Sequence, residues 1–232
     1  MKLFELAIEY HKELCPKFWD DKTLKTEVRE KLIEITDSFI EFLEVELKPQ
    51  DITLTGSAAN YNWTSKSDID LHIVVDMAEF TKACPDLAED FFNGKKTIWN
   101  EHHEIDIYGH PVEIYVQPST EEHTSSGVYS VKDDKWVEEP QYDPPEDVNA
   151  QAVKKKANEY KKKIDGLIGS SGNSEEADRL KDDIREYRQT GLDTEEAEFS
   201  VPNLVFKELR NSGYMEKIID YIRSDTSKEL SL

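Results

Sequence analysis

Apolar residues recur at helical spacing through the first 48 residues. One stripe runs from Leu3 to Leu14 and a longer one from Leu24 to Leu43, ending before Pro49. Apolar side chains three or four positions apart share one face of an α-helix, so each stripe predicts an amphipathic helix. Two helices are therefore expected before any strand. The first stripe consists of Leu3, Leu6, Tyr10 and Leu14.

Short runs with strand character follow between residues 50 and 140. Residues 52–55 form one run, residues 69–75 a second, and residues 111–117 a third in which apolar and polar side chains alternate. Alternation places successive side chains on opposite faces of a sheet. Further strands are expected around Asp106 and, as a pair joined by a turn at 132–135, near Val128 and Trp136.

A helix is expected between the second and third of these strands. Its pattern runs from Pro85 to about Glu101, with Leu87, Phe91 and Trp99 as the predicted buried face. Such a helix returns the chain across the sheet. The pattern as a whole indicates an α/β (α+β) fold built on a small mixed β-sheet.

Beyond residue 146 the chain is expected to be helical. Three prolines within residues 139–146 resist both helix formation and strand pairing, which marks a boundary there. Apolar stripes then predict a helix over 153–167, a second that Ser174 caps and a third that begins at Ser200. The expected organisation is one domain over 1–140, with N-terminal helices (1–48) and a sheet core (50–140), followed by a helical C-terminal region over 146–232.

The composition restricts the classes of function. No run approaches the roughly 20 apolar residues that span a bilayer, and the N-terminus lacks a secretory signal, so a cytoplasmic protein without membrane contact is expected. Cys15 and Cys84 fit neither a disulfide framework nor a zinc site. The net charge of −21 opposes binding of long nucleic acids. Six lysines within Lys154–Lys163 form either a solvated helix face or a counter-charge for a triphosphate or an RNA acceptor.

Two carboxylates at the start of the second strand are the strongest chemical signal in the chain. Asp68 and Asp70 lie two positions apart, so both project to one face of the strand, opposite Ile69 and Leu71. Carboxylates in this arrangement suit a hard divalent cation such as Mg²⁺, which usually binds one or two of them together with substrate phosphates. The pattern therefore indicates phosphoryl-transfer chemistry.

The Gly56–Ser57 pair ends the strand that precedes these carboxylates. A glycine lets the backbone turn tightly there, and the N–H groups of such a turn, together with the Ser57 hydroxyl, can bind phosphate oxygens. Ser67, which is adjacent to Asp68, is a further candidate for a phosphate contact.

Three other polar or aromatic residues lie near these motifs. His72 shares a face with Asp70, but a histidine on a half-buried strand is more often packed and hydrogen-bonded than functional. Tyr61 and Trp63 either stack on a base or an acceptor or pack within their loop.

A strand ends at Gly56–Ser57, and after ten further residues Asp68-Ile69-Asp70 opens an apolar strand. This order of motifs resembles the signature of the polymerase-beta-like nucleotidyltransferase superfamily. Members of that superfamily carry a third carboxylate on a later strand of the same sheet. Glu113 is the favoured candidate here and Asp106 the competing one. The segment His123–Val131 is similar to a stretch in phage-encoded proteins of this kind, and its role does not follow from the sequence.

The resemblance implies a nucleotidyltransferase that moves a nucleoside monophosphate from an NTP to an acceptor and releases pyrophosphate. It implies Mg²⁺, or alternatively Mn²⁺, with Asp68 and Asp70 holding two ions roughly 3.5 to 4 Å apart and Glu113 binding one of them. The acidic composition favours a small molecule or a protein hydroxyl as the acceptor. The alternatives are an RNA 3′ end, that of transfer RNA included, reached through Lys154–Lys163, and a catalytically idle module that binds a nucleotide or a partner. A phage-encoded member would act in the host cytoplasm.

Overall fold

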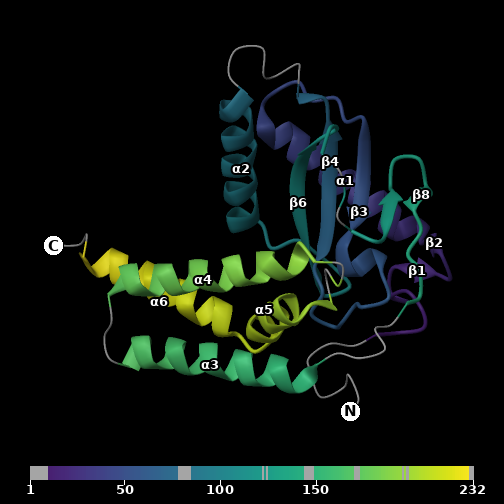
Figure 1. The fold of residues 1–232 in the computed structure, drawn as a ribbon. Helices are drawn as coiled ribbons and strands as arrows, with labels where there is room; N and C mark the ends of the chain where they lie inside the picture. Colours follow the sequence, from purple (N-terminus) through teal and green to yellow (C-terminus); the bar gives the residue numbers. More distant parts are fainter. Residues whose placement is uncertain are drawn as a thin grey trace. The chain divides into compact units, whose positions relative to one another are not determined.

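The chain divides into two compact units. One comprises Tyr10–Asp143, and the other contains the chain from Pro144 onward (Figure 1). The computed structural model describes residues 10–77, 85–121, 123, 125–143, 149–169, 173–194, 196 and 199–229.

The first unit is built on a six-stranded mixed sheet. Its strand order is β5-β6-β4-β3-β7-β8, in which β4 and β6 run parallel and the other neighbours run antiparallel. The strands expected from the alternation are all present, and the fold class is confirmed. Their bounds are β3 Asp51–Thr55, β4 Ile69–Val75, β5 Asp106–Ile107, β6 His110–Pro118, β7 Val128–Ser130 and β8 Lys135–Glu138.

The two faces of this sheet differ in character. On β4, Ile69, Leu71 and Ile73 are buried, whereas Asp70 and His72 between them are half-buried. The helix α1 (Thr26–Leu43) shares a continuous core with the apolar side chains and lies against that face (Figure 1). The opposite side, which carries Asp70, His72, Glu113 and Tyr115, is here called the acidic face.

The prediction of a first N-terminal helix, over the stripe from Leu3 to Leu14, is wrong for the part of that segment that the structure describes. Residues 1–9 lie outside the described part of the chain, and residues 10–15 are not helical. Pro16 follows them and resists helix formation, and Leu14 reaches the core from an irregular segment. A hairpin of β1 (Trp19–Asp20) and β2 (Thr23–Leu24) then leads into α1.

The helix α2 (Pro85–His102) lies where the sequence predicts it, and Trp99 is buried as predicted, but Leu87 is exposed and Phe91 is only half-buried. Leu87 is 65% exposed, whereas Phe92 is 3% and Trp99 6% exposed. Trp99 packs against Phe39 and Phe42 of α1. Consecutive helical residues project about 100° apart, so Phe92 is buried in the core while its neighbour Phe91 packs against the edge of it.

The described residues of the second unit form four helices around their own core. These are α3 Ala150–Gly169, α4 Ser174–Leu192, α5 Val201–Asn211 and α6 Tyr214–Glu229. Ser200 caps α5 as predicted, its side chain accepting a hydrogen bond from the Asn203 N–H. Ser174 was expected to cap α4, but Asn173 does so, accepting from the Glu176 N–H at 2.8 Å. No helix in the described part of the chain is long and apolar enough to cross a membrane.

Candidate functional site

Three carboxylates converge on the acidic face of the sheet. Asp70 and Glu113 are directly paired across the parallel strands β4 and β6, and Asp68 immediately precedes β4. One carboxylate oxygen from each lies within 4.8 Å of the others, and all three residues are half-buried. We call these residues the carboxylate triad. Its members come together because paired residues on neighbouring strands project to the same face.

The donor set of the triad fits a hard divalent cation. Three carboxylates so close together repel one another, and a bound cation removes that repulsion. Oxygen ligands of this kind suit Mg²⁺, Mn²⁺ or Ca²⁺ rather than the softer metals. Asp106, the competing candidate, lies elsewhere: it is exposed and its Oδ1 accepts the Gly109 N–H at 2.7 Å, which stabilises the β5–β6 turn.

A short 3₁₀ turn, Gly56–Ala59, follows β3 and lies directly against the triad. Gly56 adopts a left-handed backbone conformation with a φ of +69°. A Cβ atom built at Gly56 would lie 1.9 Å from Oδ2 of Asp70. Glycine is therefore required at this position for two reasons, the left-handed turn and the close approach of the Asp70 carboxylate.

The two serines predicted to contact phosphate are hydrogen-bonded to each other. The Ser57 hydroxyl donates to Oγ of Ser67 at 2.8 Å, and the Thr64 N–H donates to the same Oγ at 2.9 Å. Ser67 is only 4% exposed, whereas Ser57 is half-buried. Ser67 thus ties its loop to the turn at Gly56, and Ser57 is the more accessible of the two hydroxyls.

The segment His123–Val131, whose role does not follow from the sequence, packs in its described part onto the Gly56–Ala59 turn. The Gly56 N–H donates to Oγ of Ser125 at 3.2 Å, and the Asn60 side-chain amide donates to Oγ of Ser126. A Cβ atom at Gly127 would lie 2.1 Å from the carbonyl oxygen of Ala59. The described residues of His123–Val131 therefore support the backbone turn beside the triad.

Tyr115 orients the third carboxylate. Its hydroxyl donates to Oε2 of Glu113 at 2.5 Å, and both residues project from β6 to the acidic face. Burial raises the pKa of Tyr115 well above its usual range, and the neighbouring Glu113 raises it further. The hydroxyl therefore stays protonated and keeps donating. The ring of Tyr115 lies parallel to that of His72 at 4.9 Å between centroids and beneath the Lys96 ammonium at 3.6 Å.

Replacing Tyr115 with Phe is expected to lower the affinity of the triad for Mn²⁺ about tenfold, because hydrogen bonds that orient a metal ligand contribute on this scale. The ring contacts with His72 and Lys96 remain in this variant, so the change isolates the hydroxyl. Titration with Mn²⁺ followed by electron paramagnetic resonance measures it. Equal affinities of the two proteins would show that Tyr115 does not orient Glu113.

His72 is packed and hydrogen-bonded, as its position on the strand predicts. Its Nδ1–H donates to Oε1 of Gln117 at 2.8 Å, and the amide of Gln117 donates to the carbonyl of Glu121 at 3.4 Å. Because an amide oxygen can only accept, Nδ1 of His72 carries the hydrogen of this bond. Burial lowers the pKa of His72 to about 4 from a usual 6.5. The neutral imidazole thus connects β4 to Gln117 of β6 and, through Gln117, to Glu121 beyond the end of that strand.

The free energy of unfolding is expected to fall as the pH drops from about 6.5 to 4. Over that interval the unfolded chain protonates His72 while the folded chain does not, and outside it the two states bind this proton equally. The loss is at most about 3.5 kcal/mol, since one pKa unit corresponds to about 1.4 kcal/mol. Urea unfolding at several pH values measures it. A His72→Asn variant keeps an N–H donor without the titration, and its stability should change less over this interval.

The aromatic residues between the two motifs pack within the fold. Tyr61 is 6% exposed and contacts the rings of Tyr10 and Tyr142. Trp63 stacks on the ring of His11 at 3.7 Å between centroids. Of the two alternatives for this pair, the structure favours packing over stacking on a ligand.

Three residues near the triad were not identified from the sequence. Tyr115 had a usable signal, because it lies two positions after Glu113 on an alternating strand. No sequence signal pointed to Lys96, since its placement depends on how α2 packs. His110 is 1% exposed, and its Nδ1–H donates to the carbonyl of Ser67 at 2.8 Å while its Nε2 accepts from the Lys17 ammonium at 3.2 Å. It therefore joins the start of β6 to the residue before Asp68.

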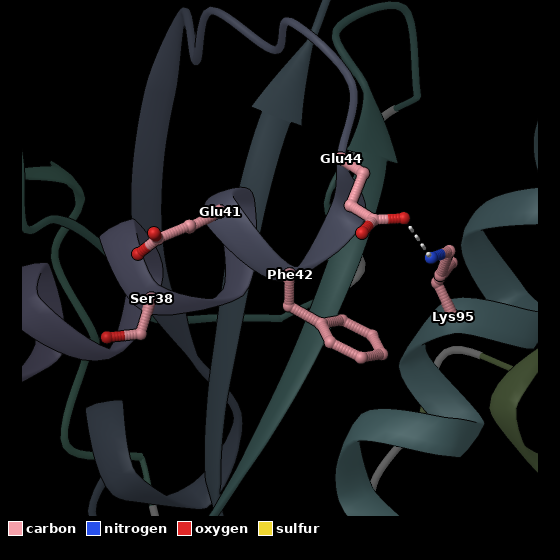
Figure 2. Close-up of a pocket in the computed structure, with 5 residues that line it drawn as sticks. All are labelled: Ser38, Glu41, Phe42, Glu44 and Lys95. Carbon is pink, nitrogen blue, oxygen red and sulfur yellow. Dashed lines mark ion pairs between the residues drawn. The ribbon is translucent and has the colours of Figure 1, made fainter.

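A shallow hollow of about 350 Å³ lies between α1 and α2 (Figure 2). Figure 2 shows the Lys95 ammonium directed toward the Glu44 carboxylate, 4.0 Å away. No member of the triad lines this hollow, so it is a separate feature. Its lining residues are Ser38, Glu41, Phe42, Glu44 and Lys95.

Comparison with protein families connects this geometry to a known domain type. Residues 36–136 match the family model described as a nucleotidyltransferase domain. The matched segment contains the Gly56 turn and all three carboxylates of the triad. Searches among curated proteins and solved structures found no match. Nothing in these comparisons supports the resemblance of His123–Val131 to phage-encoded proteins.

Proposed function

We propose that the Tyr10–Asp143 unit is a nucleotidyltransferase that uses an NTP as donor and releases pyrophosphate. The observation that supports this best is the carboxylate triad, because three convergent acids lie within the segment that matches the nucleotidyltransferase domain. A module that only packs against a partner has no need of carboxylates that repel one another.

In the proposed reaction the acceptor oxygen forms a bond to the α-phosphorus of the NTP. The bond from that phosphorus to the α–β bridging oxygen breaks, pyrophosphate leaves with the electron pair, and the acceptor proton passes to solvent. One or two Mg²⁺ or Mn²⁺ ions held by Asp68, Asp70 and Glu113 would neutralise phosphate charge and lower the pKa of the acceptor hydroxyl. The N–H groups of the Gly56 turn and the Ser57 hydroxyl would bind phosphate oxygens. Catalysis of this kind depends on positioning and electrostatics.

The acceptor that the charge distribution favours is a small molecule or a protein hydroxyl. The net charge is −21, and the lysine-rich segment of α3 is partly neutralised within its own unit. Lys161 pairs with Glu208 at 2.8 Å and Lys156 lies 3.7 Å from Glu159. These pairs reduce the charge that Lys154–Lys163 could offer to an RNA acceptor.

The proposal is tested by incubating the protein with each of the four α-³²P-labelled NTPs, Mg²⁺ or Mn²⁺, and a cell lysate. The lysate is then separated into protein, RNA and small-molecule fractions. Label in the protein or small-molecule fraction supports the proposal, and label in RNA would replace the proposed acceptor with an RNA end. Metal-dependent nucleotide binding without any label would show an idle nucleotide-binding module instead.

A further inference from the structure

Lys96 projects from α2 toward the acidic face of the sheet. Its ammonium lies 3.6 Å from the centroid of the Tyr115 ring, which is close for a cation–π contact. In Figure 1, α2 lies beside β6, the strand that carries Glu113 and Tyr115. The hydroxyl of the same tyrosine donates to Glu113, so one side chain connects the cation and the triad.

Lys95, the preceding residue, provides a contrast. Consecutive helical residues project about 100° apart. The Lys95 ammonium lies over the ring of Phe42 at 4.9 Å and near the exposed carboxylate of Glu44, on the hollow between α1 and α2 (Figure 2). Two adjacent lysines on one helix thus occupy different environments, and only Lys96 approaches the triad.

Lys96 is half-buried over the Tyr115 ring. Burial lowers its pKa, and the attraction of Glu113 and Asp70 offsets part of this effect. A lysine that served merely as counter-charge to the triad would compete with a bound divalent cation. A lysine that binds a polyanion would instead act together with that cation, because both attract the same phosphate oxygens.

We propose that Lys96, held over the Tyr115 ring, binds a phosphate group of the nucleotide triphosphate at the triad. This assignment rests on the proposed function and adds a residue from α2 to the phosphate-binding groups of the Gly56 turn. Lys96 and the metal ligands would then bind the triphosphate from two sides. The contact of Lys96 with the Tyr115 ring, whose hydroxyl donates to Glu113, places the cation near the triad.

The two roles for Lys96 predict opposite results when it is replaced. We would measure the affinities of Lys96→Met for Mn²⁺ alone and for inorganic triphosphate in the presence of Mn²⁺, a probe that is independent of the base. Loss of a charged hydrogen bond should weaken triphosphate binding about tenfold to a hundredfold. Binding of Mn²⁺ alone should be unchanged or tighter, because a nearby positive charge is removed.

Two further variants control this measurement. Lys95→Met removes a lysine from the same helix outside the acidic face and should leave triphosphate affinity unchanged. Lys96→Arg keeps a cation and should retain most of it. Equal triphosphate affinity of Lys96→Met and the unaltered protein would overturn the assignment of Lys96 alone, and so would a loss of Mn²⁺ binding in that variant.

The same measurement separates this assignment from the proposed function. If the unaltered protein binds no triphosphate with Mn²⁺, both the proposed function and the role of Lys96 are wrong. If triphosphate binding depends on Lys96 but no NTP is ever transferred, the phosphate-binding role holds and the proposed catalysis fails.

Discussion

Replacing Asp70 with Asn is expected to reduce nucleotidyl transfer on the order of 10³-fold or more while leaving the first unit folded. Asp70 is the central member of the triad, paired with Glu113 across β4 and β6 and close to the Gly56 turn. The amide has nearly the same shape but lacks the charge that attracts a divalent cation. Preorganised charge at the reacting group commonly accounts for losses of this size. Label transfer from the preferred α-³²P-labelled NTP measures the effect.

The stability of this variant distinguishes a catalytic role from a structural one. Removing one of three mutually repelling carboxylates should leave the free energy of unfolding unchanged or raise it. Asp106→Asn is the matched control, since that exposed side chain lies outside the triad and an asparagine oxygen can still accept the Gly109 N–H. Normal transfer by Asp70→Asn would contradict the proposed function, and unfolding would show that the carboxylate is structural.

Much of the site could be predicted because it depends on a period of two along strands. Alternation alone placed Asp70 and Glu113 on the faces opposite Leu71 and Ile114, and the structure confirms these orientations. The pairing of β4 with β6 then brings the two carboxylates together. A glycine before a serine likewise predicted a tight turn, because few other residues adopt its backbone conformation.

The features that could not be predicted depend on tertiary packing. Lys96 lies over Tyr115 because α2 buries Phe92 together with the expected Trp99, whereas the sequence favoured Leu87 and Phe91 beside Trp99. A rotation of one residue turns a different lysine toward the sheet. The bond from Ser125 to Gly56 also joins positions 69 residues apart, and no local pattern encodes it. The role of the His123–Val131 segment was therefore not apparent from the sequence.

Replacing Gly56 with Ala is expected to disrupt the triad by a steric collision, whereas Asp70→Asn removes a charge. The added Cβ would lie 1.9 Å from Oδ2 of Asp70, so that carboxylate or the turn must move. A displaced ligand should weaken Mn²⁺ binding about tenfold to a hundredfold and lower transfer at least as much. The left-handed backbone, with its φ of +69°, costs an alanine roughly 1–2 kcal/mol of stability in addition. Mn²⁺ titration and thermal unfolding measure the two effects.

Gly109→Ala separates the backbone strain from the collision with Asp70. Gly109 has a φ of +80° in the turn before β6, and a Cβ there would meet no heavy atom within 4 Å. This variant should therefore lose a similar roughly 1–2 kcal/mol of stability to strain while keeping its Mn²⁺ affinity and its transfer rate. A similar loss of Mn²⁺ binding in both variants would mean that backbone strain, not the position of Asp70, limits metal binding. A loss confined to Gly56→Ala would instead show that metal binding requires the Asp70 carboxylate to lie where a side chain at residue 56 would be.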